Sequence, residues 1–237
     1  MSGTARYDDV ADFYAAGWTD AVDDPASVRL LALLEPIAGR RVLEVACGHG
    51  RVCRALARRG AHVVGVDISS ALIEKARDAE REAPLGISYH HADVTAPDIP
   101  DVSGPFDAVV CSFGLSDIDD LDGAVATAAR ALRPGGVFVC SILHPCFPGG
   151  RDVSGSWPGD AGYFTEEWWR ADGELSSLRR QVGANHRTLS TYVNTFRRHG
   201  LWLEEMAEPE PASEWAAKRP DAAKFPVFLV MRFGRNS

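Results

Sequence analysis

The 237-residue chain has few cysteines and no long apolar run, and both absences exclude classes of protein. Its five cysteines are Cys47, Cys53, Cys111, Cys140 and Cys146, and none of them forms a C-x-x-C pair. An odd count without such pairs argues against a disulfide framework and a zinc site, so we expect no bound metal and a reducing, cytoplasmic location. No stretch approaches the roughly 18 apolar residues of a membrane span, and the N-terminus lacks the apolar core of a signal peptide.

Basic residues are also scarce relative to acidic ones, with 25 lysines and arginines against 33 aspartates and glutamates. The net charge of −8 and the lack of a basic stripe with interleaved aromatics argue against a phosphate-backbone partner. We therefore expect a small-molecule partner, and neither a nucleic acid nor a membrane. The chain is long enough for one sizeable core, so we predict a single domain that is a monomer or a homodimer.

In the first half of the chain, short β-like runs alternate with amphipathic helical runs. The predicted strands are 41–46, 61–66, 86–91, 106–112 and 137–143, and the predicted helices are 51–59, a segment capped by Ser69, and 121–132. This alternation is typical of a parallel sheet with helices on both faces. Because ligands of such sheets bind beyond the carboxyl ends of the strands, the residues that follow each strand are the candidates for chemistry.

The second half departs from this rhythm. Residues 144–187 are rich in glycine and aromatics without a dominant period, which predicts a functional insertion such as a substrate lid. A helix pattern resumes at Thr188, and two strands follow at 201–207 and 226–233. No crossover helix of sufficient length separates these strands, so we expect this last pair to be antiparallel.

The predicted fold class is therefore α/β. We expect a single doubly wound, Rossmann-like, seven-stranded and mostly parallel sheet, with an antiparallel C-terminal strand and an aromatic-rich insertion after the fifth strand. Within it we expect an N-terminal helical cover (1–40), a cofactor-binding core (41–143), a substrate-lid insertion (144–187) and a C-terminal helix and strand pair (188–237).

The strongest local signal is Val42-Leu-Glu-Val-Ala-Cys-Gly-His-Gly50, a strand that leads through a glycine turn into a helix. Gly48 and Gly50 permit positive φ and a close approach to the backbone. Asp67 ends the next predicted strand, where a carboxylate can accept hydrogen bonds from both hydroxyls of a ribose. Asp93 follows the third strand, where it can accept from an adenine amine. Together these positions predict a nucleoside site.

These segments, in this order, resemble the class I S-adenosylmethionine-dependent methyltransferases, especially those that act on small molecules. The resemblance rests on residues 44–50, Asp67, Asp93, 106–114 and the Leu-Arg-Pro-Gly-Gly turn at 132–136, and it covers roughly residues 7–145 well. One departure is Ala46, which stands where the family has glycine. Alanine is tolerable there if its φ stays negative, and it would then shift the turn slightly without abolishing it.

The resemblance implies that the chain binds S-adenosylmethionine and releases S-adenosylhomocysteine after methylating the oxygen or nitrogen of a small organic molecule. The cofactor contacts predicted on this basis are Tyr14, Glu44, Ala46, Cys47, Gly48, Gly50, Arg51, Asp67, Ile68, Ser69, Asp93, Val94, Ser112 and Phe113. For Tyr14, a helix that merely packs its aromatics on the domain is an equal alternative.

Methyl transfer to a hydroxyl calls for a base, whereas a neutral amine needs none. His144, directly after the fifth strand, and His186, before the later helix, are the candidate catalytic residues. The alternative for His144 is that it fixes its loop by hydrogen bonding. The predicted substrate contacts are Phe147, Trp157, Tyr163 and Trp168, with a small satellite core as the alternative. The paired arginines Arg179 and Arg180 are expected on a solvated face.

Other functions remain open at this point. A protein of the same fold can bind S-adenosylmethionine for non-methylating chemistry or without turnover. A more distant alternative is an NAD-dependent oxidoreductase, whose fingerprint also has a glycine turn and a later acidic residue. That fingerprint wants a third glycine or alanine where this chain has Cys53.

Overall fold

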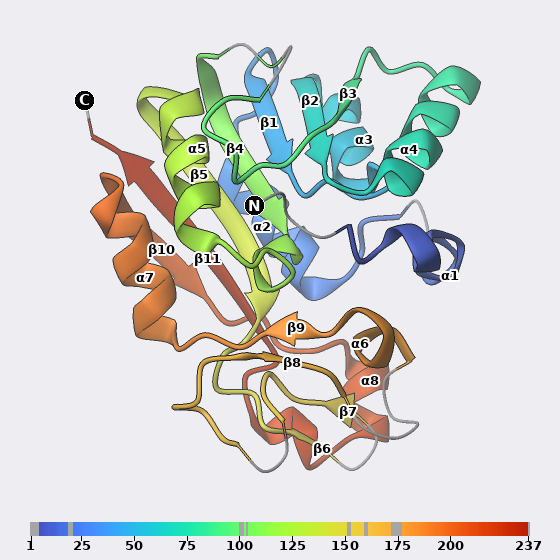
Figure 1. The fold of residues 1–237 in the computed structure, drawn as a ribbon, viewed down its shortest axis with the longest axis vertical. Coiled ribbons are helices and arrows are strands. Elements are labelled where there is room, and N and C mark those ends of the chain that lie inside the picture. The colour runs from blue at the N-terminus through green and yellow to red at the C-terminus, as the bar shows by residue number, and fades with distance from the viewer. Residues whose placement is uncertain are drawn as a thin grey trace.

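The computed structural model describes residues 5–18, 21–99, 102, 104–150, 153–158, 161–171 and 177–236. A seven-stranded sheet in the order β10-β11-β5-β4-β1-β2-β3 runs through the molecule (Figure 1). Its strands are β1 (Arg41–Val45), β2 (His62–Asp67), β3 (Ser88–His91), β4 (Phe106–Ser112), β5 (Leu132–Leu143), β10 (Leu201–Ala207) and β11 (Phe228–Arg235). The predicted α/β class and seven-stranded sheet are confirmed.

Strands β1 to β5 are parallel, while β11 is antiparallel to both of its neighbours, β5 and β10. The connection from β10 to β11 contains only α8 (Ser213–Lys218) and the short 3₁₀ turn η3 (Ala222–Lys224). A parallel crossover usually needs a longer helical segment, so this connection returns the chain in the opposite direction. The expected antiparallel C-terminal pair is confirmed.

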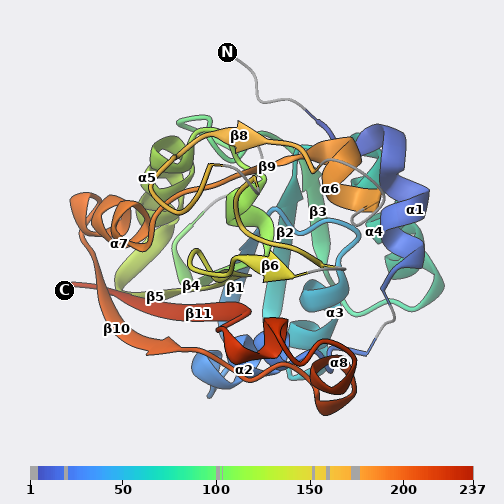
Figure 2. The ribbon, with the colours of Figure 1, turned by 90° about the horizontal axis from the view of Figure 1, so that it is seen from below.

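Helices cover both faces of the sheet. α2 (Pro25–Leu34), α3 (Arg51–Arg58) and α4 (Ser70–Glu82) pack on one face, and α5 (Leu121–Ala131) and α7 (Leu189–Arg198) pack on the other. Figure 2 shows α2 and α3 on the opposite side of the strands from α5 and α7. In β1 the side chain of Val42 joins the first core and Leu43 joins the second, as the alternation of a strand buried on both faces requires.

Strand β5 is longer than the sequence indicates. It begins at Leu132 rather than Val137, so the predicted turn at 133–136 lies within it. Pairing with β4 passes from Phe106↔Leu132 directly to Ala108↔Val137, and the residues between bulge out of the ladder. Gly135 adopts a φ of 71° in this bulge. The turn residues therefore interrupt the strand without ending it.

The N-terminal segment and the insertion both lie near the carboxyl ends of the strands. The 3₁₀ turn η1 (Asp8–Val10) and α1 (Ala11–Ala16) contact α4. The insertion forms small elements below the sheet (Figure 1), namely β6 (Gly149–Gly150), β7 (Val153–Ser154), β8 (Trp168–Trp169), α6 (Ser177–Val182) and β9 (Ala184–Asn185). Among the described residues, no helix combines the length and the apolar character needed to span a bilayer.

Candidate functional site

A cavity of about 310 Å³ opens at the carboxyl ends of the central strands. After β1 the chain builds β2 and β3 on one side and then β4 and β5 on the other, so this is the switch point where ligands of doubly wound sheets bind. One wall consists of residues predicted to contact the cofactor: Ala46, Gly48, Asp67, Ile68, Ser69, Ser112 and Phe113. Tyr14 and Trp18 of the N-terminal segment cover this wall.

The turn after β1 has left-handed backbone at three positions. Ala46 has a φ of 53°, Gly48 a φ of 56° and Gly50 a φ of 81°. The condition of a negative φ at Ala46 is not met, because the left-handed conformation begins before the first glycine of the turn. For alanine this conformation costs about 1–2 kcal/mol. The tight turn lets the Gly48 N–H reach Asp67 and lets the ring of Tyr14 lie over it: a Cβ on Gly48 would stand 3.5 Å from that ring.

Gly50 also lacks space for a side chain, and this predicts a measurable loss of stability. A Cβ at Gly50 would lie 2.3 Å from the hydroxyl oxygen of Tyr89, whose side chain is buried. We expect Gly50→Ala to lower the free energy of unfolding by about 2–4 kcal/mol, the sum of left-handed strain and overpacking. The matched control is Gly86→Ala, since Gly86 has a φ of 80° but no atom within 4 Å of the place where a Cβ would stand. Backbone strain alone should lower the free energy of unfolding of Gly86→Ala by about 1 kcal/mol. Equal losses for the two variants in urea denaturation would contradict the steric argument.

Asp67 is the buried carboxylate of the cavity wall. Its Oδ2 accepts from the Gly48 N–H at 2.7 Å and its Oδ1 accepts from the Ser69 N–H at 2.8 Å. Burial raises the pKa of Asp67, and these two backbone bonds oppose that effect. Each carboxylate oxygen has a second lone pair, so the side chain keeps acceptor capacity toward the cavity that it lines.

Glu44 lines a smaller neighbouring space, the extension, of about 30 Å³, which shares Tyr14, Trp18, Ala46, Ser112 and Phe113 with the main cavity. Its Oε2 is buried and has no hydrogen-bond partner among the described residues. Burial raises the pKa of Glu44 to about 8. An unpartnered buried carboxylate oxygen is costly in the free protein and marks a place where a cation or a donor would be stabilised.

Arg51 and Cys47 also line the extension, but the guanidinium of Arg51 is already engaged. It donates to the Asp24 carboxylate at 2.8 Å and to the Ser27 hydroxyl at 3.1 Å. It also lies 4.3 Å from the ring centroid of Trp18. Arg51 therefore fixes the N-terminal segment over the glycine turn that follows β1.

Three of the predicted cofactor residues, Gly50, Asp93 and Val94, line neither space. The Asp93 Oδ1 accepts from the backbone N–H of Thr95 at 2.9 Å and from its hydroxyl at 2.7 Å. Val94 packs in the core beside α5. An adenine contact of Asp93 stays a prediction.

The two candidate bases lie outside the cavity. His144 is buried, and its Nδ1 accepts from the Cys146 N–H at 3.0 Å, so the proton sits on Nε2 and is donated to Glu208 at 3.0 Å. Burial lowers the pKa of His144, while Glu208 opposes this. The Nε2 of His186 donates to the carbonyl of Tyr163 at 2.8 Å. A base role for either residue stays a prediction, and the geometry favours the loop-fixing alternative for His144.

The predicted substrate contacts do not line the cavity either. Phe147 is fully buried beside Ala222, Trp157 and Tyr163 stack edge to face at 6.2 Å, and Trp168 is partly exposed. The packing of Phe147, Trp157 and Tyr163 favours the alternative of a small satellite core, and their contact with substrate stays a prediction. The insertion contributes α6 to the cavity instead, through Leu178, Arg179 and Val182.

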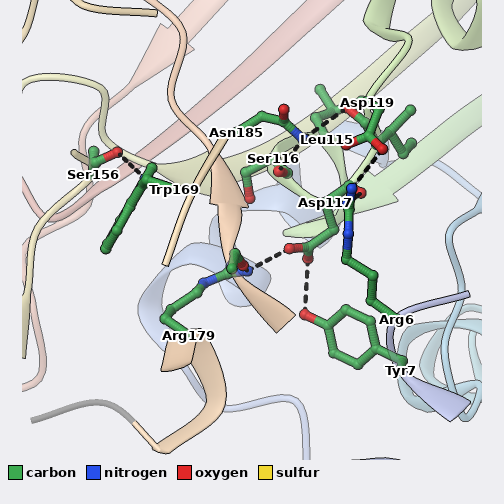
Figure 3. A network of polar contacts seen from close by, with 12 residues as sticks. Arg6, Tyr7, Leu115, Ser116, Asp117, Asp119, Ser156, Trp169, Arg179 and Asn185 are labelled. Carbon is green, nitrogen blue, oxygen red and sulfur yellow. Dashed lines mark hydrogen bonds and ion pairs between the residues drawn. The ribbon is translucent and has the colours of Figure 1, made fainter. Parts of the chain in front are cut away.

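A polar group that the sequence did not predict also lies in the cavity wall (Figure 3). The hydroxyl of Tyr7 donates to the Asp117 Oδ2 at 3.0 Å, and Arg179 donates to the Asp117 Oδ1 and to the Gly183 carbonyl. All three side chains line the cavity, so the expectation that Arg179 is a solvated surface residue was wrong. The available signal was position: Asp117 follows β4 by five residues, at the ligand end of the sheet.

Comparison with known proteins gives three further findings. Residues 43–140 match the family model of a methyltransferase domain. A demethylmenaquinone methyltransferase of Tropheryma whipplei is 31% identical over 169 residues, which cover 64% of this chain and 69% of that protein. A ubiquinone biosynthesis O-methyltransferase of Alkalilimnicola ehrlichii is 38% identical over 109 residues, which cover 46% of this chain and 43% of that protein.

The chain thus spans about half the length of the ubiquinone-type relatives that it matches. Among solved structures, an S-adenosylmethionine-dependent methyltransferase from Mesorhizobium loti aligns with a TM-score of 0.68 and 29% identity. That alignment covers 89% of this chain and 98% of the other.

Proposed function

Because the chain belongs to the class I S-adenosylmethionine-dependent methyltransferase family, we propose that it transfers the methyl group of that cofactor to an oxygen or nitrogen of a small organic molecule. The supporting observation is that one cavity joins the glycine turn and Asp67 to an apolar and polar surface on its other side. The cofactor, when bound, supplies a methyl group on a positively charged sulfur. The protein binds and orients the two reactants.

The residues of the cavity fit this cofactor. Asp67 has lone pairs left for two ribose hydroxyls, and Gly48 leaves room for close approach to the backbone. The unpartnered Oε2 of Glu44 fits the ammonium group of the methionyl end, because a cation there offsets the cost of the buried charge. The two carboxylates would thus hold opposite ends of the cofactor.

The acceptor would occupy the space between the glycine turn and α6. The apolar residues that line this part of the cavity are Ile118, Leu143, Leu178, Val182 and Phe228. This surface suits an apolar ring or chain with one polar group directed at Asp117. Relatives named for ubiquinone biosynthesis and for demethylmenaquinone methylation support an acceptor of this type.

Calorimetric titration with S-adenosylmethionine, with NAD as the control, tests the cofactor assignment first. Micromolar binding of S-adenosylmethionine alone is expected, and binding of NAD alone would overturn the proposal in favour of the oxidoreductase alternative. A mass-spectrometric screen then tests turnover by the appearance of methylated acceptor together with S-adenosylhomocysteine. Tight cofactor binding without product from any acceptor class would favour the non-methylating or non-catalytic alternative.

A further inference from the structure

We propose that Asp117 binds the hydroxyl group of the methyl acceptor and takes its proton during transfer. This inference rests on the proposed function and assigns the base to a residue that the sequence motifs do not identify. It commits the acceptor atom to oxygen, because a neutral amine needs no proton acceptor at the moment of transfer.

Position is the first argument. Asp117 follows the 3₁₀ turn η2 (Gly114–Ser116) at the carboxyl end of β4, and its side chain is 20% exposed and lines the cavity. The charges of Asp117 and Asp67 both act on the hydroxyl of Tyr14, which lies over the glycine turn. The ring centroids of Tyr14 and of Tyr7, which donates to Asp117, lie 5.1 Å apart. Among the described lining residues there is no histidine.

The loop that carries Asp117 is held in place by the end of the insertion. The guanidinium of buried Arg187 donates to the carbonyls of Leu115 at 3.0 Å, Ile118 at 2.7 Å and Asp119 at 2.8 Å. Asn185 donates to the Ser116 carbonyl at 3.2 Å and to the Asp119 carboxylate at 2.9 Å (Figure 3). Four of these hydrogen bonds hold backbone carbonyls on both sides of Asp117 and the fifth holds the Asp119 carboxylate, as the positioning of a reacting group requires.

The surroundings of the carboxylate keep it available as an acceptor. Arg179 balances its charge on Oδ1, and the Tyr7 hydroxyl donates to Oδ2. Burial and the Asp117 charge raise the pKa of Tyr7 well above its usual value, so this hydroxyl remains a donor. A carboxylate offers about four acceptor sites, and these two bonds leave capacity for a hydroxyl of the acceptor in the cavity.

The proposed step is balanced in atoms and charge. The acceptor oxygen forms a bond to the methyl carbon, and the carbon–sulfur bond breaks with its electron pair going to sulfur. The hydroxyl proton passes to the Asp117 carboxylate, which releases it to water after the product leaves. One positive charge on sulfur and one negative charge on Asp117 are both neutralised.

The decisive variant is Asp117→Asn, which keeps the shape of the side chain and removes the proton acceptor. The acceptors are catechol and other hydroxybenzenes, with the corresponding anilines as amine probes. We expect kcat for a hydroxyl acceptor to fall about 100-fold or more, the usual contribution of a positioned base. Asp117→Glu should recover part of the loss. Asp122→Asn, an exposed aspartate on α5 that does not line the cavity, is the charge-matched control and should keep wild-type turnover.

Two binding readouts separate this role from others. Affinities for S-adenosylmethionine and S-adenosylhomocysteine should stay within about threefold of wild type in Asp117→Asn, since the carboxylate acts on the acceptor. If Asp117→Asn loses affinity for S-adenosylmethionine but not for S-adenosylhomocysteine, the proposal is overturned, and Asp117 instead interacts with the positively charged sulfur. If wild-type protein binds the cofactor but methylates only anilines and no hydroxybenzene, the base role is also overturned. Failure of wild-type protein to bind cofactor would instead overturn the proposed function itself.

A second variant guards against a simple folding defect. Tyr7→Phe removes one donor to Asp117 and leaves the carboxylate in place. A loss in kcat of about three- to tenfold is expected, because one hydrogen bond that positions the carboxylate disappears. Equal losses of stability and turnover in both variants would show that the group only holds the N-terminal segment to α6.

Discussion

Replacing Asp67 with alanine is expected to weaken S-adenosylmethionine binding by about 100-fold or more. Hydrogen bonds to a charged acceptor contribute about 1.5–3 kcal/mol each, so two ribose hydroxyls would lose about 3–6 kcal/mol. Each 1.4 kcal/mol is about a factor of ten in the dissociation constant. The variant also leaves the N–H groups of Gly48 and Ser69 without their acceptor, which loosens the turn itself.

Calorimetry with the cofactor and with S-adenosylhomocysteine gives the measurement, since both carry the ribose. Asp93→Ala is the comparison variant, because it removes a carboxylate at the end of the neighbouring strand that does not line the cavity in the free protein. An affinity for Asp67→Ala within about threefold of wild type, where the lost bonds predict about 100-fold, would remove Asp67 from the cofactor site. A loss of affinity in Asp93→Ala as large as that in Asp67→Ala would support the adenine contact that the sequence predicts for Asp93.

The cavity wall around the glycine turn was predictable because its residues follow single strands in chain order. A strand end fixes where a side chain emerges, so Gly48 and Asp67 are placed by local pattern alone. The helix starts were equally local: the Ser69 hydroxyl accepts from the Leu72 N–H, as a capping residue does. Backbone conformation was less accessible, since the positive φ of Ala46 depends on how sharply the turn leaves β1.

The cavity wall that contains Tyr7, Asp117 and Arg179 was not predictable because it is assembled from distant segments. Tyr7, Asp117 and Arg179 are separated by 110 and 62 positions along the chain, and no periodicity connects them. Residue type favours histidine as a base near neutral pH, but it cannot show that the ring nitrogens of His144 are hydrogen-bonded to Cys146 and Glu208. Only the folded contacts show which titratable group faces the cavity.

Glu44 predicts a pH dependence of stability that a glutamine removes. Its pKa is raised to about 8 in the folded protein, against about 4.5 for an ordinary glutamate. Between these values the unfolded chain is ionised while the folded one holds the proton, so the contribution of Glu44 to stability falls as pH rises and levels off above pH 8. From pH 5 to pH 8, wild type should therefore lose about 2–4 kcal/mol relative to Glu44→Gln. Urea denaturation across this range measures the difference, and parallel curves for the two proteins would contradict the raised pKa.

The Glu44 side chain, which destabilises the free protein, should strengthen binding of the cofactor. If the cofactor ammonium lies against Oε2, it lowers the pKa of Glu44, and binding at pH 7 releases a proton. Calorimetry in buffers of different ionisation enthalpy detects that proton for wild type, and none is expected for Glu44→Gln. The variant should bind S-adenosylmethionine about tenfold or more weakly, since a charge-assisted bond is lost. A variant that binds as tightly as wild type, without a change in proton release, would show that Glu44 meets no cation. A buried carboxylate that destabilises the free protein and strengthens the complex has the stability cost expected of a binding residue. Such a role for Glu44 would account for a glutamate inside the buried strand β1.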